Sequence, residues 1–203
     1  MRKNLTLYIA LILMITFLSS CIGQNAPENG LFEDTPCGPP CLFDVKPELS
    51  NKVDVKDAIK KFGFLDRCEE KSNPELKEVV YIECQQPRMN FVINTSEDKV
   101  IGIAFWPNST ITLRTIIERY GNPDFVTCYS GETTPEHPRK EVNLYYVKNG
   151  MAVVLEDFES HTANVKPFTR IDSFVYSPWF VEEIGKGKYT QAWNGYGEYK
   201  PNP

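Results

Sequence analysis

The chain has few of the residue patterns on which enzymes and metal proteins depend. It contains two histidines in 203 residues, His137 and His161, which limits general-base and zinc chemistry. The segment Tyr129-Ser130-Gly131-Glu132 does not form the G-x-S-x-G elbow that exposes a nucleophilic serine, and a surface loop is the simpler interpretation. No glycines are spaced to cradle a phosphate. Nucleotide binding therefore has no support in the sequence.

Three residues near position 160 are possible metal ligands. Asp157, Glu159 and His161 alternate along the chain, so an extended backbone would place all three on one face. A solvated hairpin rim explains the same pattern, and the lack of flanking apolar alternation favours the rim. We therefore expect no metal, no cofactor and no catalytic residue.

The chain also lacks an excess of positive charge. Its formal net charge is -5, and without the first 20 residues it becomes -7, because that segment removes Arg2 and Lys3 but no acidic residue. Nucleic-acid binding needs clustered lysine and arginine, whereas basic and acidic residues are mixed here. These charges exclude nucleic acid as a partner and give little attraction to an anionic membrane.

No apolar run reaches the roughly 18 to 20 residues that span a bilayer. The run from Leu5 to Leu18 has 14 residues and follows two basic residues. The sequence Leu18-Ser19-Ser20-Cys21 then places small residues before a cysteine, as in a bacterial lipobox. We expect a signal peptide over residues 1–20 and lipidation of Cys21. Its acyl chains would hold the protein at the extracytoplasmic face of the cell membrane or outer membrane.

Five cysteines remain after Cys21, an odd number, so at least one is free or pairs between molecules. Secretion would place them in an oxidising compartment. Cys37 and Cys41 are spaced too widely for a C-x-x-C pair, which leaves a structural disulfide, an inert thiol pair, or metal or redox chemistry. Cys68 and Cys84 flank the segment 69–78 and are candidates to clip a strand.

Residues 21–40 are rich in asparagine, glycine, proline and acidic residues, which is typical of a flexible tether. An amphipathic helix follows, with Asp54 as its expected cap and Gly63 at its end. The same apolar spacing returns 58 residues later, ending at Gly121. The apolar positions are Val55, Ala58, Ile59 and Phe62 in the first helix and Leu113, Ile116, Ile117 and Tyr120 in the second. This repetition indicates an internal duplication.

Three β-rich segments follow each helix. They cover 78–84, 89–93 and 99–105 after the first helix, and 142–147, 151–156 and 170–176 after the second. We therefore predict an α+β fold of two tandem α-β-β-β units, over 41–107 and 108–178. Short connections favour antiparallel meanders. The units could join edge to edge into one largely antiparallel sheet with helices on one face, leaving the other face free for a partner.

This arrangement resembles the β-lactamase inhibitor protein fold, and one unit is similar to the small lipoprotein of the outer-membrane β-barrel assembly machinery. Further features are Pro40-Cys41 before a helix, Tyr120-Gly121-Asn122-Pro123-Asp124, Leu144-Tyr145-Tyr146 and Trp193-Asn194-Gly195-Tyr196-Gly197. Through these motifs, the chain from about Cys37 to Tyr199 resembles uncharacterised bacterial lipoproteins of duplicated architecture. The resemblance implies a fold rather than an activity.

The last segment, 179–203, carries six aromatic residues without a helix or strand period. They are Trp179, Phe180, Tyr189, Trp193, Tyr196 and Tyr199. Aromatic rings with polar tips are frequent at interfaces and stack on sugars or peptides. The simpler interpretation is that they fold back to cap the sheet, with Trp193 in a closing lid.

These observations predict a membrane-anchored, non-enzymatic lipoprotein whose sheet binds another envelope or extracellular protein, in assembly, as an adaptor or as an inhibitor. The alternative is a lipoprotein that holds glycan or peptide on its aromatic C-terminal tail.

Overall fold

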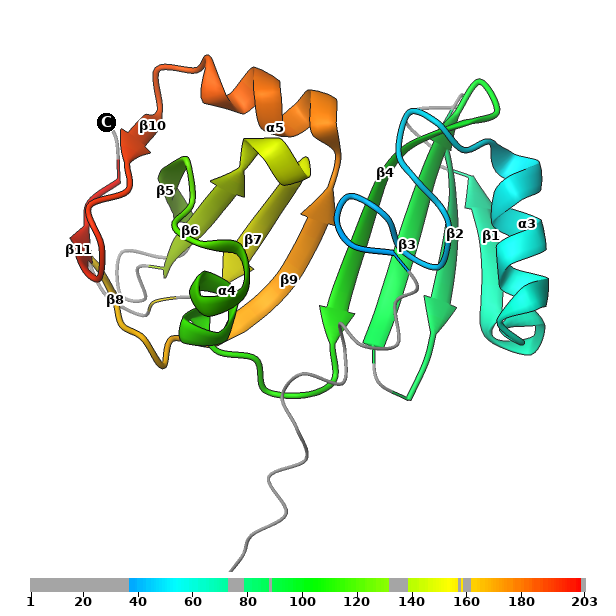
Figure 1. The fold of residues 1–203 in the computed structure, drawn as a ribbon, viewed down its shortest axis with the longest axis horizontal. Helices are drawn as coiled ribbons and strands as arrows, with labels where there is room; N and C mark the ends of the chain where they lie inside the picture. The colour runs from blue at the N-terminus through cyan, green and yellow to red at the C-terminus, as the bar shows by residue number, and fades with distance from the viewer. Residues whose placement is uncertain are drawn as a thin grey trace, which may run out of the picture.

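The computed structural model describes residues 37–72, 79–87, 89–131, 139–156, 158 and 162–201. The fold is α+β, as expected, and its centre is a nine-stranded antiparallel sheet (Figure 1). The strands of this sheet are β1 Cys68–Ser72, β2 Val79–Gln85, β3 Met89–Ser96, β4 Lys99–Pro107, β5 Phe125–Gly131, β6 Arg139–Tyr146, β7 Met151–Leu155, β9 Ile171–Tyr176 and β10 Thr190–Ala192. A separate pair joins β8 Ala163–Val165 to β11 Gly197–Tyr199.

The spatial order of the large sheet is β1-β2-β3-β4-β9-β7-β6-β5-β10. It consists of two halves, β1–β4 and β5–β7 with β9, which meet through the last strand of each. A helix precedes each half, α3 (Lys52–Lys61) and α4 (Leu113–Tyr120). Four strands of the large sheet, rather than the expected three, follow each helix, because β1 and β5 precede the predicted segments; β8, in the separate pair, also lies between β7 and β9.

Local chemistry explains where α3 begins. The side chain of Asn51 accepts hydrogen bonds from the backbone N–H groups of Val53 and Asp54, and the Asp54 carboxylate accepts one from the Asn51 N–H. This reciprocal capping box satisfies donors that the first helical turn leaves unpaired. The N-cap is therefore Asn51 rather than Asp54, which was the expected cap.

The two helices bury corresponding positions against the same side of the sheet. In α3 the buried residues are Val55, Ala58 and Ile59. In α4, Ile116 is fully buried, whereas Ile117 is only partly buried. Gly121 ends α4 with a φ of 79°, a conformation that side chains with a Cβ rarely adopt.

The segment 41–50 completes the cover on the first half. Its Phe43 ring lies 5.3 Å from the ring of Phe62, 4.9 Å from Phe64 and 5.4 Å from Phe91. These side chains belong to one continuous core that extends beneath α3 and α4. An N-terminal segment, not only the helix, therefore closes this side of the sheet.

A third helix, α5 (Pro178–Gly185), lies on the opposite face of the second half (Figure 1). It buries Val181 against Tyr145, in a small core separate from the main one. A Cβ on Gly185 would lie 2.7 Å from the Phe125 ring, so only glycine permits this close approach. The two predicted helices thus share one face of the sheet, whereas α5, which was not predicted, buries its apolar stripe on the other.

The tail also contributes strands, contrary to expectation. β10 pairs with β5 at the edge of the large sheet, and β11 pairs with β8. The tail is thus part of the fold, because it satisfies the backbone groups of two otherwise open strand edges.

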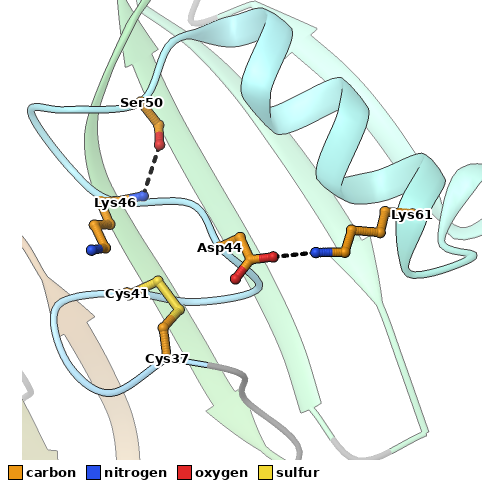
Figure 2. Close-up of a disulfide and its surroundings, with 6 residues drawn as sticks. All are labelled: Cys37, Cys41, Asp44, Lys46, Ser50 and Lys61. Carbon is orange, nitrogen blue, oxygen red and sulfur yellow. Dashed lines mark hydrogen bonds and ion pairs between the residues drawn. A yellow bond between two sulfur atoms is a disulfide. The ribbon is translucent and has the colours of Figure 1, made fainter.

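Both expected disulfides are present. Cys37 and Cys41 are bonded at a Cα–Cα distance of 5.5 Å, and Cys68 and Cys84 at 4.1 Å. The second joins directly paired positions of β1 and β2. Beside the first, the Asp44 carboxylate pairs with the Lys61 ammonium at 2.5 Å, which ties the segment 41–50 to α3 (Figure 2).

We expect Ile116→Ala to lower the free energy of unfolding by about 2 to 5 kcal/mol, because it leaves a cavity beneath α4. Urea denaturation followed by circular dichroism measures the loss. Val53→Ala, at an exposed position of α3, is the control and should change stability by less than about 0.5 kcal/mol. Equal effects of the two changes would contradict this core assignment.

The Cys68–Cys84 bond should stabilise the fold by about 3 kcal/mol, since it closes a loop with a sequence separation of 16. The double variant Cys68→Ala/Cys84→Ala should lose that amount in denaturant titration. The Cys37–Cys41 bond closes a loop with a sequence separation of only 4, so Cys37→Ala/Cys41→Ala should lose less free energy of unfolding. A larger loss from the Cys37/Cys41 variant would contradict the expectation that the longer loop gives the greater stabilisation.

Candidate functional site

Several residues singled out from the sequence lie outside the described residues. They are Cys21, His137, Asp157, Glu159 and His161. Within the described ranges, no group of three histidine, cysteine, aspartate or glutamate side chains is arranged to hold a metal ion. The segment Tyr129–Gly131 forms the end of β5 rather than a loop. The candidate site must therefore come from surfaces rather than from a ligand cluster.

Three of the aromatic tail residues gather over one end of the main core. The Trp193 ring stacks on Tyr199 at 5.7 Å, and Tyr196 meets Trp193 edge-on at 6.1 Å. The Tyr199 hydroxyl donates to the Gly195 carbonyl at 2.8 Å. Tyr199 is buried and Trp193 packs against the core, so these two rings serve packing and leave Tyr196 exposed.

The other three aromatic residues lie elsewhere. Trp179 and Phe180 are exposed in the first turn of α5, and Tyr189 is exposed beside Lys188, whose ammonium lies 4.8 Å from the ring centre. The six residues therefore form no single platform. Trp179 is the most exposed of them, with 67% of its surface accessible.

A partly accessible face remains on the first half of the sheet, opposite α3. Pairing and burial assign one row of side chains from each of β2, β3 and β4 to this uncovered face. The row members are Tyr81, Glu83, Gln85, Asn90, Val92, Asn94, Gly102, Ala104 and Trp106; all are exposed or half-buried except Gly102, which is buried beside Ser177. Ile82, Cys84, Phe91, Ile93, Ile103 and Phe105, which alternate with these residues, are buried in the main core. On the second half, α5 covers the corresponding face.

The uncovered face is hollowed at its outer end. A cavity of about 620 Å³ lies there, lined by Asp66, Arg67, Cys68, Glu69, Lys71, Glu83, Gln85, Gln86, Pro87 and Asn90. The Lys71 ammonium lies 2.5 Å from a Glu83 oxygen and 3.5 Å from a Glu69 oxygen. The Glu83 carboxylate accepts a hydrogen bond from Lys71 and thereby raises the pKa of that ammonium. The cavity is therefore polar and largely charge-balanced.

A second hollow lies where α5 meets β4. It has a volume of about 390 Å³ and is lined by Glu48, Ile101, Pro178, Trp179 and Glu182. The Trp179 backbone N–H donates to the Glu48 carboxylate at 2.8 Å, across 131 positions of sequence. The hollow thus joins the two halves of the fold.

The one cysteine outside the two disulfides in the described chain, Cys128, is buried in β5. Burial raises the pKa of its thiol, and the thiol donates to the Tyr199 carbonyl at a sulfur–oxygen distance of 3.9 Å. A thiol held in its neutral form is a poor nucleophile. Cys128 is therefore a packing residue.

Of the residues that line the two hollows, sequence reasoning singled out only Cys68, as a disulfide candidate, and Trp179. The β-branched and aromatic residues of Asn90-Phe91-Val92-Ile93-Asn94 signal a strand, with no alternation that reveals which of its faces is exposed. Pro178 at the start and Gly185 at the end of an apolar segment signal a short helix. No local pattern indicates that Glu48 would contact α5.

Comparisons with known proteins give no functional assignment. No protein-family model matches the chain, and no curated protein matches it. Among solved structures, a cysteine-rich secretory protein from Staphylococcus aureus subsp. aureus Mu50 is similar with a TM-score of 0.37 and 9% sequence identity. The match covers 78% of this chain and 56% of that chain, so this chain spans little more than half of that protein's length.

As for membrane crossing, none of the helices formed by the described residues combines the length and apolar character that a bilayer span needs.

Truncation after Gly187 should lower the melting temperature by at least about 5 °C, because it removes β10 and the buried ring of Tyr199. It should also expose core surface to a hydrophobic dye. The matched control, Tyr196→Ala in the full chain, removes an exposed ring and should leave the melting temperature within about 2 °C. An unchanged melting temperature after truncation would show that the tail does not close the core.

Proposed function

We propose that the chain is a membrane-anchored, extracytoplasmic lipoprotein that binds another protein of the cell envelope or its surroundings and performs no catalysis. The observation that carries this proposal is the uncovered face of the first half of the sheet. α5 covers the same side of the sheet only on the second half. The face that it leaves open on the first half is suited to a broad protein contact. By binding its partner there, the chain would act in assembly, as an adaptor or as an inhibitor.

The sequence Leu18-Ser19-Ser20-Cys21 supports a lipid anchor at Cys21. The two disulfides support it, since stable disulfides are typical of secreted and envelope proteins. We assign the protein to the outer side of the cell membrane or to the outer membrane.

We further propose that the fold arose by duplication, as in the lipoproteins it resembles. One unit is α3 with β1–β4, and the other is α4 with β5–β7 and β9. The mirrored strand order and the matching helices support this proposal.

The aromatic tail is a weaker candidate for glycan or peptide binding. Trp193 donates its indole N–H to Asn122 at 3.3 Å and stacks on Tyr199, so its polar edge and one ring face are engaged within the fold. A sugar would need those rings to be free.

Replacing Cys21 by serine should abolish lipidation and release the protein from the membrane, because the lipid is attached through that sulfur. Metabolic labelling with a fatty-acid analogue and membrane fractionation measure both effects. Cys128→Ser should retain the label and is the matched control. A diacylglyceryl mass on the Cys21→Ser chain would refute the lipobox assignment.

To test the proposed interface, the full chain is crosslinked in intact cells and its partners are identified after solubilisation. Trp106→Ala combined with Asn90→Glu changes two exposed side chains of the uncovered face and should abolish the major crosslink. Phe168→Ala, at an exposed site of the second half, should retain it. A crosslink that survives the face variant, or a glycan array that binds the chain through Tyr196, would overturn the proposal.

A further inference from the structure

The hollow between α5 and β4 has the composition of a site for a cation carried on an apolar stem. Ile101, Pro178 and Trp179 give it apolar walls, and Glu48 and Glu182 place two carboxylates on it. Its volume of about 390 Å³ falls within the range of ligand sites.

The apolar residues at this hollow are unusually accessible. Trp179 is 67% exposed and Ile101 is 43% exposed. Leu49, next in sequence to Glu48, is 80% exposed. Among the described residues, the Trp179 ring has no stacking partner. Tryptophan is the residue most enriched at the energetic centre of protein interfaces, where it is covered by the partner.

The backbone holds Glu48 in place at the hollow. Its φ is 67°, in the left-handed region that a residue with a Cβ seldom adopts. The Glu48 N–H donates to the Val100 carbonyl at 2.7 Å, and its carboxylate accepts the Trp179 N–H at 2.8 Å. The carboxylate therefore accepts a hydrogen bond from one of the N–H groups that the first turn of α5 leaves unpaired. Because Glu48 and Glu182 both line the hollow, an anion would be repelled there.

The charges at the hollow favour a cation. No lysine or arginine among the described residues forms an ion pair with Glu48. Glu182 lies 3.2 Å from the Lys186 ammonium, which also contacts Glu183 at 2.8 Å. Glu48 thus has a backbone N–H but no cationic side chain as its described partner, at a hollow that Trp179 also lines.

An arginine side chain matches this arrangement better than lysine does. Its planar guanidinium stacks on an indole face and also donates hydrogen bonds to a carboxylate. Its methylene groups would lie along Ile101 and Pro178. A lysine ammonium lacks the planar surface for stacking.

We propose that the hollow receives an arginine side chain from a protein partner, and that an apolar residue next to this arginine contacts Leu49. The inference rests on the proposed function, because β4 carries both Ile101 at the hollow and Trp106 on the uncovered face. The arginine would anchor one end of the segment that lies across that face.

The test is a titration of the full lipidated chain in detergent micelles with the peptide N-acetyl-Leu-Arg-Leu-amide. The chain has three tryptophans, so the indole N–H signals of Trp106 and Trp193 are internal controls for Trp179 in the NMR spectrum. We expect a saturable shift of the Trp179 signal alone. The peptide with citrulline, the neutral isostere of arginine, should bind at least about tenfold more weakly.

Matched variants separate binding from folding. Glu48→Gln keeps an acceptor for the Trp179 N–H but removes the charge, so it should weaken the arginine peptide about tenfold at an unchanged melting temperature. Glu182→Gln should weaken it severalfold. Glu183→Gln, on the same helix but outside the hollow, should leave the affinity unchanged.

Equal binding of the arginine and citrulline peptides, or an unchanged affinity in Glu48→Gln, would overturn the inference. A Trp179 shift produced by phosphatidylcholine vesicles but not by the peptide would assign the hollow to the membrane and also overturn it. If the partner crosslink still depends on Trp106 and Asn90 while the peptide does not bind, only this inference fails. Loss of that dependence would remove the proposed function separately.

Discussion

The pairing of β4 with β9 is the contact on which the whole fold depends. Three residue pairs, from Ile103↔Tyr176 to Phe105↔Phe174, join two halves that each consist of consecutive strands. The rings of Phe105 and Phe174 stack at 4.8 Å within the main core, so the joint is both a hydrogen-bonded ladder and an apolar contact. Without it, each half would expose the edge of its last strand.

The joint is short, and other contacts extend it. The pairing of β4 with β9 does not extend to the residues of β4 before Ile103. There the loop before α3 pairs with β4 instead: the Glu48 N–H donates to the Val100 carbonyl, and the Val100 N–H donates to the Ser50 carbonyl. The Ser177 hydroxyl then donates to the Ile101 carbonyl at 3.1 Å. Glu48, whose φ is 67°, contacts both the first half, through Val100, and α5, through Trp179. The same geometry produces the hollow at Trp179, so structure and proposed recognition share one set of residues.

The distribution of helices determines which surfaces remain available. α3, α4 and the segment 41–50 close one side of the sheet, whereas α5 closes only half of the other. The accessible rows of β2, β3 and β4 follow from this asymmetry. A sheet face that mixes Trp106, Val92, amides and paired charges provides an apolar centre with a polar rim, which is the usual composition of a protein interface.

The sequence by itself determined the elements whose signals are local. The apolar spacing of Val55, Ala58 and Ile59 predicted α3, and Cys68 and Cys84 were correctly identified as a pair, because helical period and flanking turns act within a few residues. β1 was missed because Cys68-Glu-Glu-Lys-Ser72 lacks apolar alternation, as an edge strand can, and its pairing with β2 stabilises it instead. Only the tertiary structure decided the β4–β9 joint, the opposite placement of α5 and the contact of Glu48 with Trp179. The joint and the Glu48 contact connect residues about seventy or more positions apart, and α5 packs on Tyr145 and Phe125, which lie far before it in the sequence. No local pattern encodes such contacts.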